Sequence, residues 1–244
     1  MIALAGAQKA AEAGDLQYLQ SKAHMLERPL LEQISLYAAR GGQLEVLQWL
    51  SLQGAALSPH MCTWAAEGGH LAVLQYAHQN GCAWDSSTCE AAAGGGHLAV
   101  LQYAHQNSCT WGPAVCSAAA ELGNLSILRW LRQHGCPWDW RTTSAAAVGD
   151  HLEVLRWARL QQPPCPLWPR QEQLRLIIRN LSPCMLVYLL QQQAPMSARH
   201  LAQARAAATK MTYAVLSLRA ALPDRTPHEA VLKIASLALM QAWQ

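Results

Sequence analysis

Phenylalanine, charged residues and long apolar runs are absent or scarce in this sequence. None of the 244 residues is Phe although ten are Trp, which indicates that a Trp-bearing segment has been copied. Only 14% of the residues are charged and 52% are hydrophobic, a balance that excludes extended disorder and a supercharged protein. No uninterrupted apolar run reaches about 18 residues, so we predict no membrane-spanning helix.

The signature motifs of the common enzyme classes are also missing. The sequence contains no Gly-x-Ser-x-Gly, no phosphate loop, no Gly-x-Gly-x-x-Gly and no His-Glu-x-x-His. The glycine triplet 94–96 resembles a phosphate-binding loop only superficially, because a helical pattern and not a strand precedes it. We therefore predict a protein that is not an enzyme, with no catalytic residues and no cofactor.

The amino-terminal residues and the cysteines bear on the cellular compartment. The first charge, Lys9, follows a very short apolar stretch, which is the reverse of a secretory signal. We expect an intracellular protein, cytoplasmic or nuclear. The eight cysteines recur at fixed phase in the repeat described next, so we interpret them as reduced packing residues and not as a disulfide framework.

A repeat of 27 residues dominates the sequence. The block 69–80 returns residue for residue as 96–107, and a Leu recurs every 27 residues at Leu44, Leu71, Leu98, Leu125 and Leu152. A fixed period of this length is typical of a stacked array in which each repeat buries its apolar face against its neighbours. We assign 1–30 to a degenerate amino-terminal capping repeat, 31–165 to five full repeats, 166–205 to degenerate repeats and 206–244 to a carboxy-terminal helical cap.

Each repeat has the pattern of two short helices. Good helix N-caps open the repeats, at Ser58, Asp85, Gly112 and Asp139. A first helix ends in an Ala-Ala pair that allows close approach of another helix, and glycines then turn the chain. The second helix carries apolar residues at helical spacing and ends at Asn80-Gly81 or its equivalents. We predict an all-α, helix-turn-helix repeat solenoid with a helical carboxy-terminal cap.

The pattern resembles the ankyrin repeat. Gly-His-Leu-x-Val-Leu, preceded by Ala-Ala and followed by Asn-Gly-Cys-x-Trp-Asp, carries the resemblance over 31–165 and, in degenerate form, over about 1–205. Two departures are clear: the usual Thr-Pro-Leu-His is missing, and the period is shorter than the family's common 33. The missing residues fall where the family has its β-hairpin. The resemblance implies a protein–protein interaction scaffold that binds its partner on a concave face, here shifted to the first helices.

Candidate recognition residues are those that vary between otherwise copied repeats. One phase of the first helix reads Arg40, Glu67, Gly94, Glu121 and Val148, and the next phase has Leu122 where other repeats have Gly. Near the caps, one repeat has Trp140-Arg141 where others have small or polar residues. Relaxed solvent exposure would produce the same variation. The candidate partner-binding residues are Arg40, Glu67, Glu121, Leu122, Trp140, Arg141 and Val148.

Recurring histidine, cysteine and aromatic residues suggest two further kinds of site. His78, Cys82 and Cys89 recur as His105, Cys109 and Cys116, but each repeat offers only three candidates where zinc needs four ligands. The next repeat has Arg132 in place of the histidine. We predict no metal, and we interpret the mid-helix cysteines as buried packing residues. Aromatic residues at two further phases (Trp84, Trp111 and Trp138; Trp49, Tyr76, Tyr103, Trp130 and Trp157) predict packing ladders in preference to a base-stacking platform.

Charge is distributed unevenly along the chain. Residues 1–165 hold nine Lys/Arg against twelve Asp/Glu, whereas residues 166–244 hold nine against three. The basic region 166–244 raises the alternative of nucleic-acid or acidic-partner binding, although its charges do not cluster and fit a solvated helical face. A third hypothesis is an adaptor fragment whose effector domain lies outside this chain. We favour a monomeric protein that binds a protein partner, with neither nucleic acid nor a membrane as its target.

Overall fold

The computed structural model describes residues 2–56, 58, 60–167 and seven isolated residues beyond them, namely Met185, Tyr188, Leu189, Ala202, Ala206, Thr209 and Lys210. Apart from these residues, the predictions for 166–205 and 206–244 lie outside the described residues. The helical carboxy-terminal cap and the basic region 166–244 belong to that part of the chain.

The described residues form helices and turns, with no strand among them, which confirms the all-α prediction. The chain divides into two compact units, Met1–Trp138 and Asp139–Gln244. The first unit holds α1 (Ile2–Ala13), α2 (Leu16–Ser21), a short 3-10 helix η1 (Ala23–Met25), α3 (Arg28–Arg40), α4 (Leu44–Leu52), α5 (His60–Glu67), α6 (Leu71–Gln79), α7 (Ser86–Gly95), α8 (Leu98–Gln106), α9 (Pro113–Glu121) and α10 (Leu125–Gln133). The second unit holds α11 (Trp140–Val148) and α12 (Leu152–Leu160).

Capping residues set the helix starts at the spacing that the sequence predicts. The Asp85 carboxylate accepts a hydrogen bond from the backbone N–H of Ser87 (2.8 Å) at the start of α7, and Asp139 does the same for Arg141 (2.8 Å) at the start of α11. Pro113 takes the first position of α9, where a missing N–H has no cost. The helices therefore recur in pairs at 27-residue spacing, and the predicted helical repeat is confirmed.

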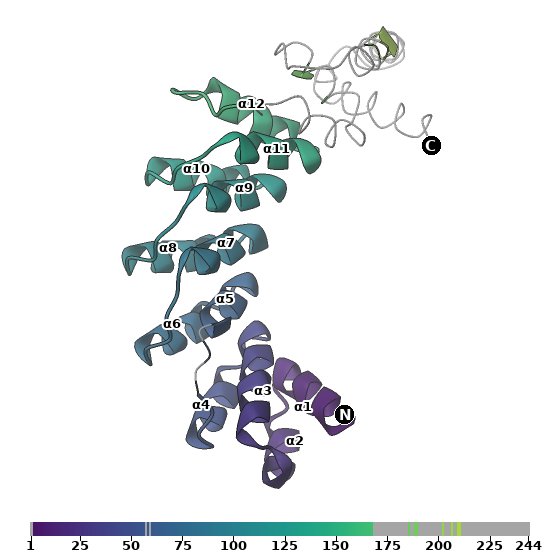
Figure 1. Ribbon diagram of the computed structural model, residues 1–244, viewed down its shortest axis with the longest axis vertical. Coiled ribbons are helices and arrows are strands. Elements are labelled where there is room, and N and C mark those ends of the chain that lie inside the picture. The colour runs from purple at the N-terminus through teal and green to yellow at the C-terminus, as the bar shows by residue number, and fades with distance from the viewer. Residues whose placement is uncertain are drawn as a thin grey trace, which may run out of the picture. The chain divides into compact units, whose positions relative to one another are not determined.

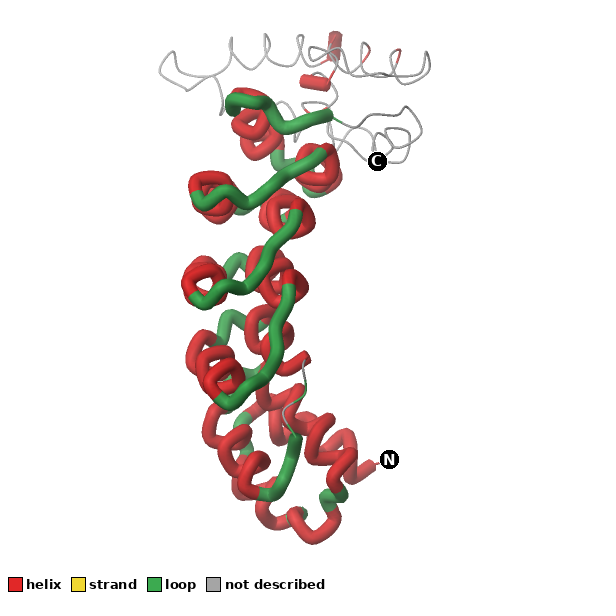
Figure 2. The backbone as a smooth tube through the Cα atoms, turned by 60° about the vertical axis from the view of Figure 1, so that its left-hand side comes forward, coloured by secondary structure: helices red, strands yellow, loops and turns green. Residues whose placement is uncertain are grey.

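Within the first unit, the helices form two columns. The first helices α1, α3, α5, α7 and α9 pack in sequence against one another, and α4, α6, α8 and α10 form the other column (Figure 1). Short loops join the two columns, as Figure 2 shows. The Ala-Ala pairs are fully buried between the first helices, at Ala65, Ala66, Ala92, Ala93, Ala119 and Ala120. These small side chains let the first helices approach closely, whereas the second helices make fewer contacts with one another.

The glycine pairs before α6 and α8 make room for histidines that join successive repeats. The His70 ring Nε2 donates to the carbonyl oxygen of Arg40 (2.8 Å), and His97 Nε2 donates to that of Glu67 (3.0 Å). A β-carbon at Gly68 would lie only 2.6 Å from the Arg40 carbonyl oxygen, so a larger residue cannot occupy this position. Each of these histidines therefore links its own repeat to the preceding one through a hydrogen bond from its side chain to the backbone.

The second unit repeats the arrangement in α11 and α12. α11 buries Thr142, Thr143, Ala146 and Ala147, and α12 buries Val154, Leu155 and Ala158. The Thr143 hydroxyl donates to the carbonyl oxygen of Pro166 (2.7 Å), where earlier repeats have a buried cysteine. Within the described part of the chain, no helix is both long and apolar enough to cross a membrane.

Candidate partner-binding surface

One side of each first helix in the Met1–Trp138 unit remains open to solvent. In α5, for example, Met61 and Cys62 are buried, whereas Trp64 is half-buried and Glu67 is exposed. This spacing of three and four residues is that of an amphipathic helix. We define the first-helix face by the equivalent positions of four helices: Gln33, Leu36, Tyr37 and Arg40; His60, Thr63, Trp64 and Glu67; Ser87, Glu90, Ala91 and Gly94; Ala114, Ser117, Ala118 and Glu121.

A cluster of rings and charges lies on this face between α3 and α5. The Tyr37 and Trp64 rings meet edge to face, with centroids 5.6 Å apart and an interplanar angle of 74°. The Arg40 guanidinium carbon lies 5.6 Å from the Trp64 ring centroid, a cation–π distance. An Arg40 nitrogen also lies 3.7 Å from a Glu67 carboxylate oxygen, and the two side chains are 48% and 54% exposed. We call these four residues the α3–α5 cluster.

The repeat itself shows that the stack does not need the two rings. The positions equivalent to Tyr37 and Trp64 hold Ala91 in α7 and Ala118 in α9, and both of these helices pack as α3 and α5 do. Sequence analysis selected Arg40 and Glu67 but missed Tyr37 and Trp64. The signal was present, because this phase reads Tyr, Trp, Ala, Ala, Ala along the five repeats. Because Tyr37 and Trp64 directly precede the buried Ala-Ala pair of their helix, the sequence favours burial for both rings.

The four predicted site residues of the first unit differ in their surroundings. Arg40 and Glu67 are paired on the first-helix face, and Glu121 is exposed at the end of α9. Leu122 is 48% exposed, but its side chain lies against the backbone of Gly96 in the preceding repeat. Leu122 replaces the usual glycine where the shorter Asn124 replaces the usual histidine. Packing thus accounts for its variation.

The other predicted residues lie at the two ends of α11. Val148 is 62% exposed at the carboxy-terminal end, and Trp140 and Arg141 form the first turn. Trp140 and Val148 are eight positions apart on α11, roughly 12 Å along the axis, so they do not form one patch. Trp140 is half-buried and Arg141 is exposed. The Arg141 guanidinium lies 5.8 Å from the Trp140 ring centroid and 3.8 Å from an Asp139 carboxylate oxygen.

The aromatic ladders lie between the second helices, as their phase predicts. The Trp84 ring stacks on His78 with centroids 3.7 Å apart, and it meets Tyr103 of the next repeat edge to face at 5.9 Å. The next repeat repeats this arrangement, with Trp111 stacked on His105 (4.1 Å) and edge-on to Trp130 (5.8 Å). The histidines of the discarded zinc hypothesis therefore belong to the ladder. Arg132, which replaces histidine in the following repeat, lies 4.2 Å from the Trp138 ring centroid.

The cysteines form buried pairs inside the repeats. Cys62, Cys89 and Cys116 are fully buried in the first helices, which confirms their predicted packing role. The Cys89 thiol donates to Cys109 Sγ (3.2 Å), and this hydrogen bond together with burial raises the pKa of the Cys89 thiol. A protonated thiol such as that of Cys89 is a poor metal ligand and a poor nucleophile, whereas the same hydrogen bond lowers the pKa of the Cys109 thiol. Across the described residues, no three His, Cys, Asp or Glu side chains converge as metal ligands would, and the seven cysteines placed there are free of disulfides.

No family model matches the chain, and no curated protein matches it either. The repeat of paired short helices at 27-residue spacing therefore stands on the sequence and the structure alone.

Proposed function

We propose that this chain is an ankyrin-like, non-enzymatic interaction module that binds a partner protein on its first-helix face. The observation that supports it is the α3–α5 cluster, in which a Trp, a Tyr and an Arg stay half-buried or exposed at positions close to one another. Trp, Tyr and Arg are the residue types most enriched among the hot spots of protein interfaces. The expected setting is a monomer inside the cell.

The chemistry of the cluster fits recognition better than internal packing. Large rings cost little conformational entropy when they bind, because they have few rotatable bonds. The repeats that follow have alanine at the same positions, so the stack closes without the rings. Arg40 has a planar guanidinium that can stack on a ring and also pair with a carboxylate of the partner. Its present ion pair with Glu67 is exposed and therefore weak, so a partner can displace it at small cost.

The test begins with identification of a partner that the full-length chain captures, followed by affinity measurements on the purified pair. We expect the double variant Arg40→Ala with Trp64→Ala to weaken binding by at least about tenfold. The matched control is Glu45→Ala, an exposed charge on α4 in the other column, which should leave the affinity unchanged. Equal affinities of the double variant and the unsubstituted protein would show that the partner does not use the first-helix face.

A further inference from the structure

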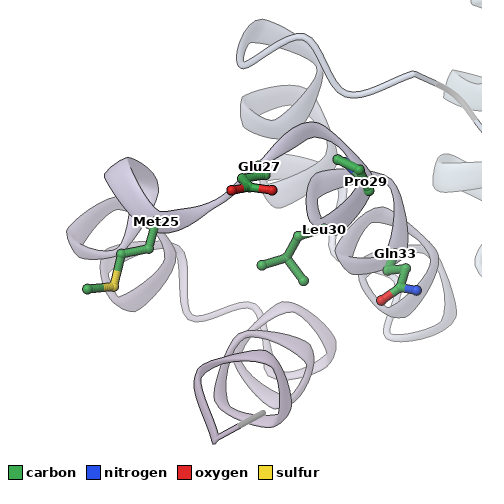
Figure 3. A pocket seen from close by; sticks show the side chains of 5 residues that line it. All are labelled: Met25, Glu27, Pro29, Leu30 and Gln33. Atoms are coloured by element: carbon green, nitrogen blue, oxygen red, sulfur yellow. The ribbon is translucent and has the colours of Figure 1, made fainter.

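A small pocket opens at the amino-terminal end of α3 (Figure 3). Its volume is about 260 Å³, and it is lined by Met25, Glu27, Pro29, Leu30 and Gln33. Gln33 is also the α3 member of the first-helix face, at the phase that holds His60 in α5. The pocket is therefore continuous with that face, at one end of α3.

The pocket combines apolar walls with a size suited to one side chain. Met25, in η1, is 58% exposed, and Leu30, in the first turns of α3, is half-buried. Small-molecule sites usually enclose about 300 to 1,000 Å³, so this pocket lies below that range. A single long side chain from another protein matches its dimensions better. The thioether of Met25 can adapt to the shape of such a guest.

The polar groups of the pocket indicate which charge a bound side chain would carry. Glu27 occupies the N-cap position of α3, but its carboxylate makes no capping hydrogen bond. The ion pairs given above, Arg40–Glu67 and Arg141–Asp139, do not involve Glu27, so neither of them offsets the charge of its carboxylate. The neighbouring Arg28 side chain reaches toward Gly54, on the loop after α4. The helix dipole places only about half a positive charge at the start of α3, which offsets part of the carboxylate charge.

We propose that this pocket holds a lysine side chain of the partner protein that binds the first-helix face, an inference that rests on the proposed function. The aliphatic stem of the lysine lies along Met25 and Leu30, where it buries apolar surface. Its ammonium group donates hydrogen bonds to the Glu27 carboxylate and to the side-chain carbonyl oxygen of Gln33. The pocket thereby requires both a long apolar stem and a positive charge at its end.

The pocket can be tested without the partner. The probe is the peptide acetyl-Ala-Lys-Ala-amide, titrated into the ¹⁵N-labelled full-length protein while backbone amide shifts are recorded by NMR. We expect saturable shifts centred on Met25, Leu30 and Gln33, and an affinity at least fivefold weaker for the norleucine analogue, which keeps the stem and lacks the charge. Glu27→Gln should weaken lysine binding to a similar extent, and the matched control Glu32→Gln, an exposed carboxylate on the same helix outside the pocket, should not. Absence of saturable shifts, or equal binding of lysine and norleucine peptides, would overturn the proposal, as would tighter binding of the arginine analogue.

The captured partner then separates this inference from the proposed function. Glu27→Gln should weaken the affinity for the partner by at least fivefold while Glu32→Gln leaves it unchanged. If Arg40→Ala with Trp64→Ala weakens partner binding and Glu27→Gln does not, the first-helix face stands and the lysine pocket is refuted. If the peptide binds in the pocket but the Arg40/Trp64 variant holds the partner normally, the proposed function fails and the pocket is no part of a first-helix interface.

Discussion

The two helix columns of the Met1–Trp138 unit share one 27-residue period but pack by opposite means. The first helices meet through fully buried alanines, such as Ala92 and Ala93 in α7. The second helices make fewer contacts with one another, and rings such as Trp84 and Tyr103 contact each other between successive repeats. Small side chains thus allow the first helices to pack closely, and aromatic rings form the contacts between successive second helices.

This difference explains where the chain can vary. The rings of the second column interlock between repeats, so His78 and Trp84 return unchanged as His105 and Trp111. The exposed positions of the first column contact little of the stack, so one phase can hold Tyr, Trp or Ala. A recognition surface can therefore change on the first helices while the repeat remains intact. Four variants, two of them with a matched control, would test this contrast.

The largest loss of stability is expected in the aromatic column. Trp111→Ala removes a ring that stacks on His105 and meets Trp130, and it leaves a cavity between repeats. We expect a loss of about 3 kcal/mol in the free energy of unfolding, measured by urea denaturation. A loss below about 1 kcal/mol would mean that the ladder is a surface feature that contributes little to the stack.

The first column should respond to added volume instead of lost volume. Ala92→Leu places three extra carbons between closely packed first helices, and overpacking should lower the free energy of unfolding by about 2 kcal/mol. The control is Ala91→Leu, one residue earlier on the half-exposed side of the same helix, which should have almost no effect. Equal effects of the two variants would contradict the assignment of Ala92 to the buried contact.

Helix boundaries and buried positions could be predicted from the sequence because they depend on local rules that every repeat obeys. Asp85 and Asp139 cap their helices, and the alanine pairs are buried. The stacking of His78 on Trp84 could not be predicted, because it depends on the angle at which the link leaves the second helix. The exposure of Trp64 was missed for a related reason: a Trp next to two buried alanines is expected to be buried as well. The pocket beside Met25 could not be predicted either. It depends on the backbone path of the degenerate amino-terminal repeat, where the 27-residue pattern does not fix the positions of the residues.

The caps at the start of the first helices should contribute less than either column, and in a pH-dependent way. The Ser87 hydroxyl and backbone N–H donate to the Asp85 carboxylate and lower the pKa of Asp85 below its usual value. Because the folded state favours the charged form, the contribution is present above the unfolded pKa of about 3.9 and is lost as the pH falls through the lower folded pKa. Asp85→Ala should cost about 1 kcal/mol at pH 7.

The control for this cap is Asp85→Asn, which preserves an oxygen acceptor at the N-cap without a titrating charge. Asparagine is about as good an N-cap as aspartate, so the variant should keep most of the stability at pH 7. Chemical denaturation at a series of pH values should show the difference between Asp85→Ala and the unsubstituted protein shrinking below about pH 4. A difference that stays constant down to pH 2 would show that the Asp85 charge plays no part.

The smallest effect on stability is expected at the first turn of α11. The variant described here also tests whether exposed residues of a first helix bind the partner. Trp140 and Arg141 pack on each other, while equivalent repeats have Ser86-Ser87 and Pro113-Ala114. Because helices with those small residues pack normally, Trp140→Ala with Arg141→Ala should change the free energy of unfolding by only about 0.5 kcal/mol. The same variant should weaken partner binding, since Trp and Arg are frequent hot spots. The assignment would be contradicted if the Trp140/Arg141 variant melted far below the unsubstituted protein while Trp111→Ala did not. That result would mean that Trp140 and Arg141 are packed in the stack and that Trp111 is a surface residue.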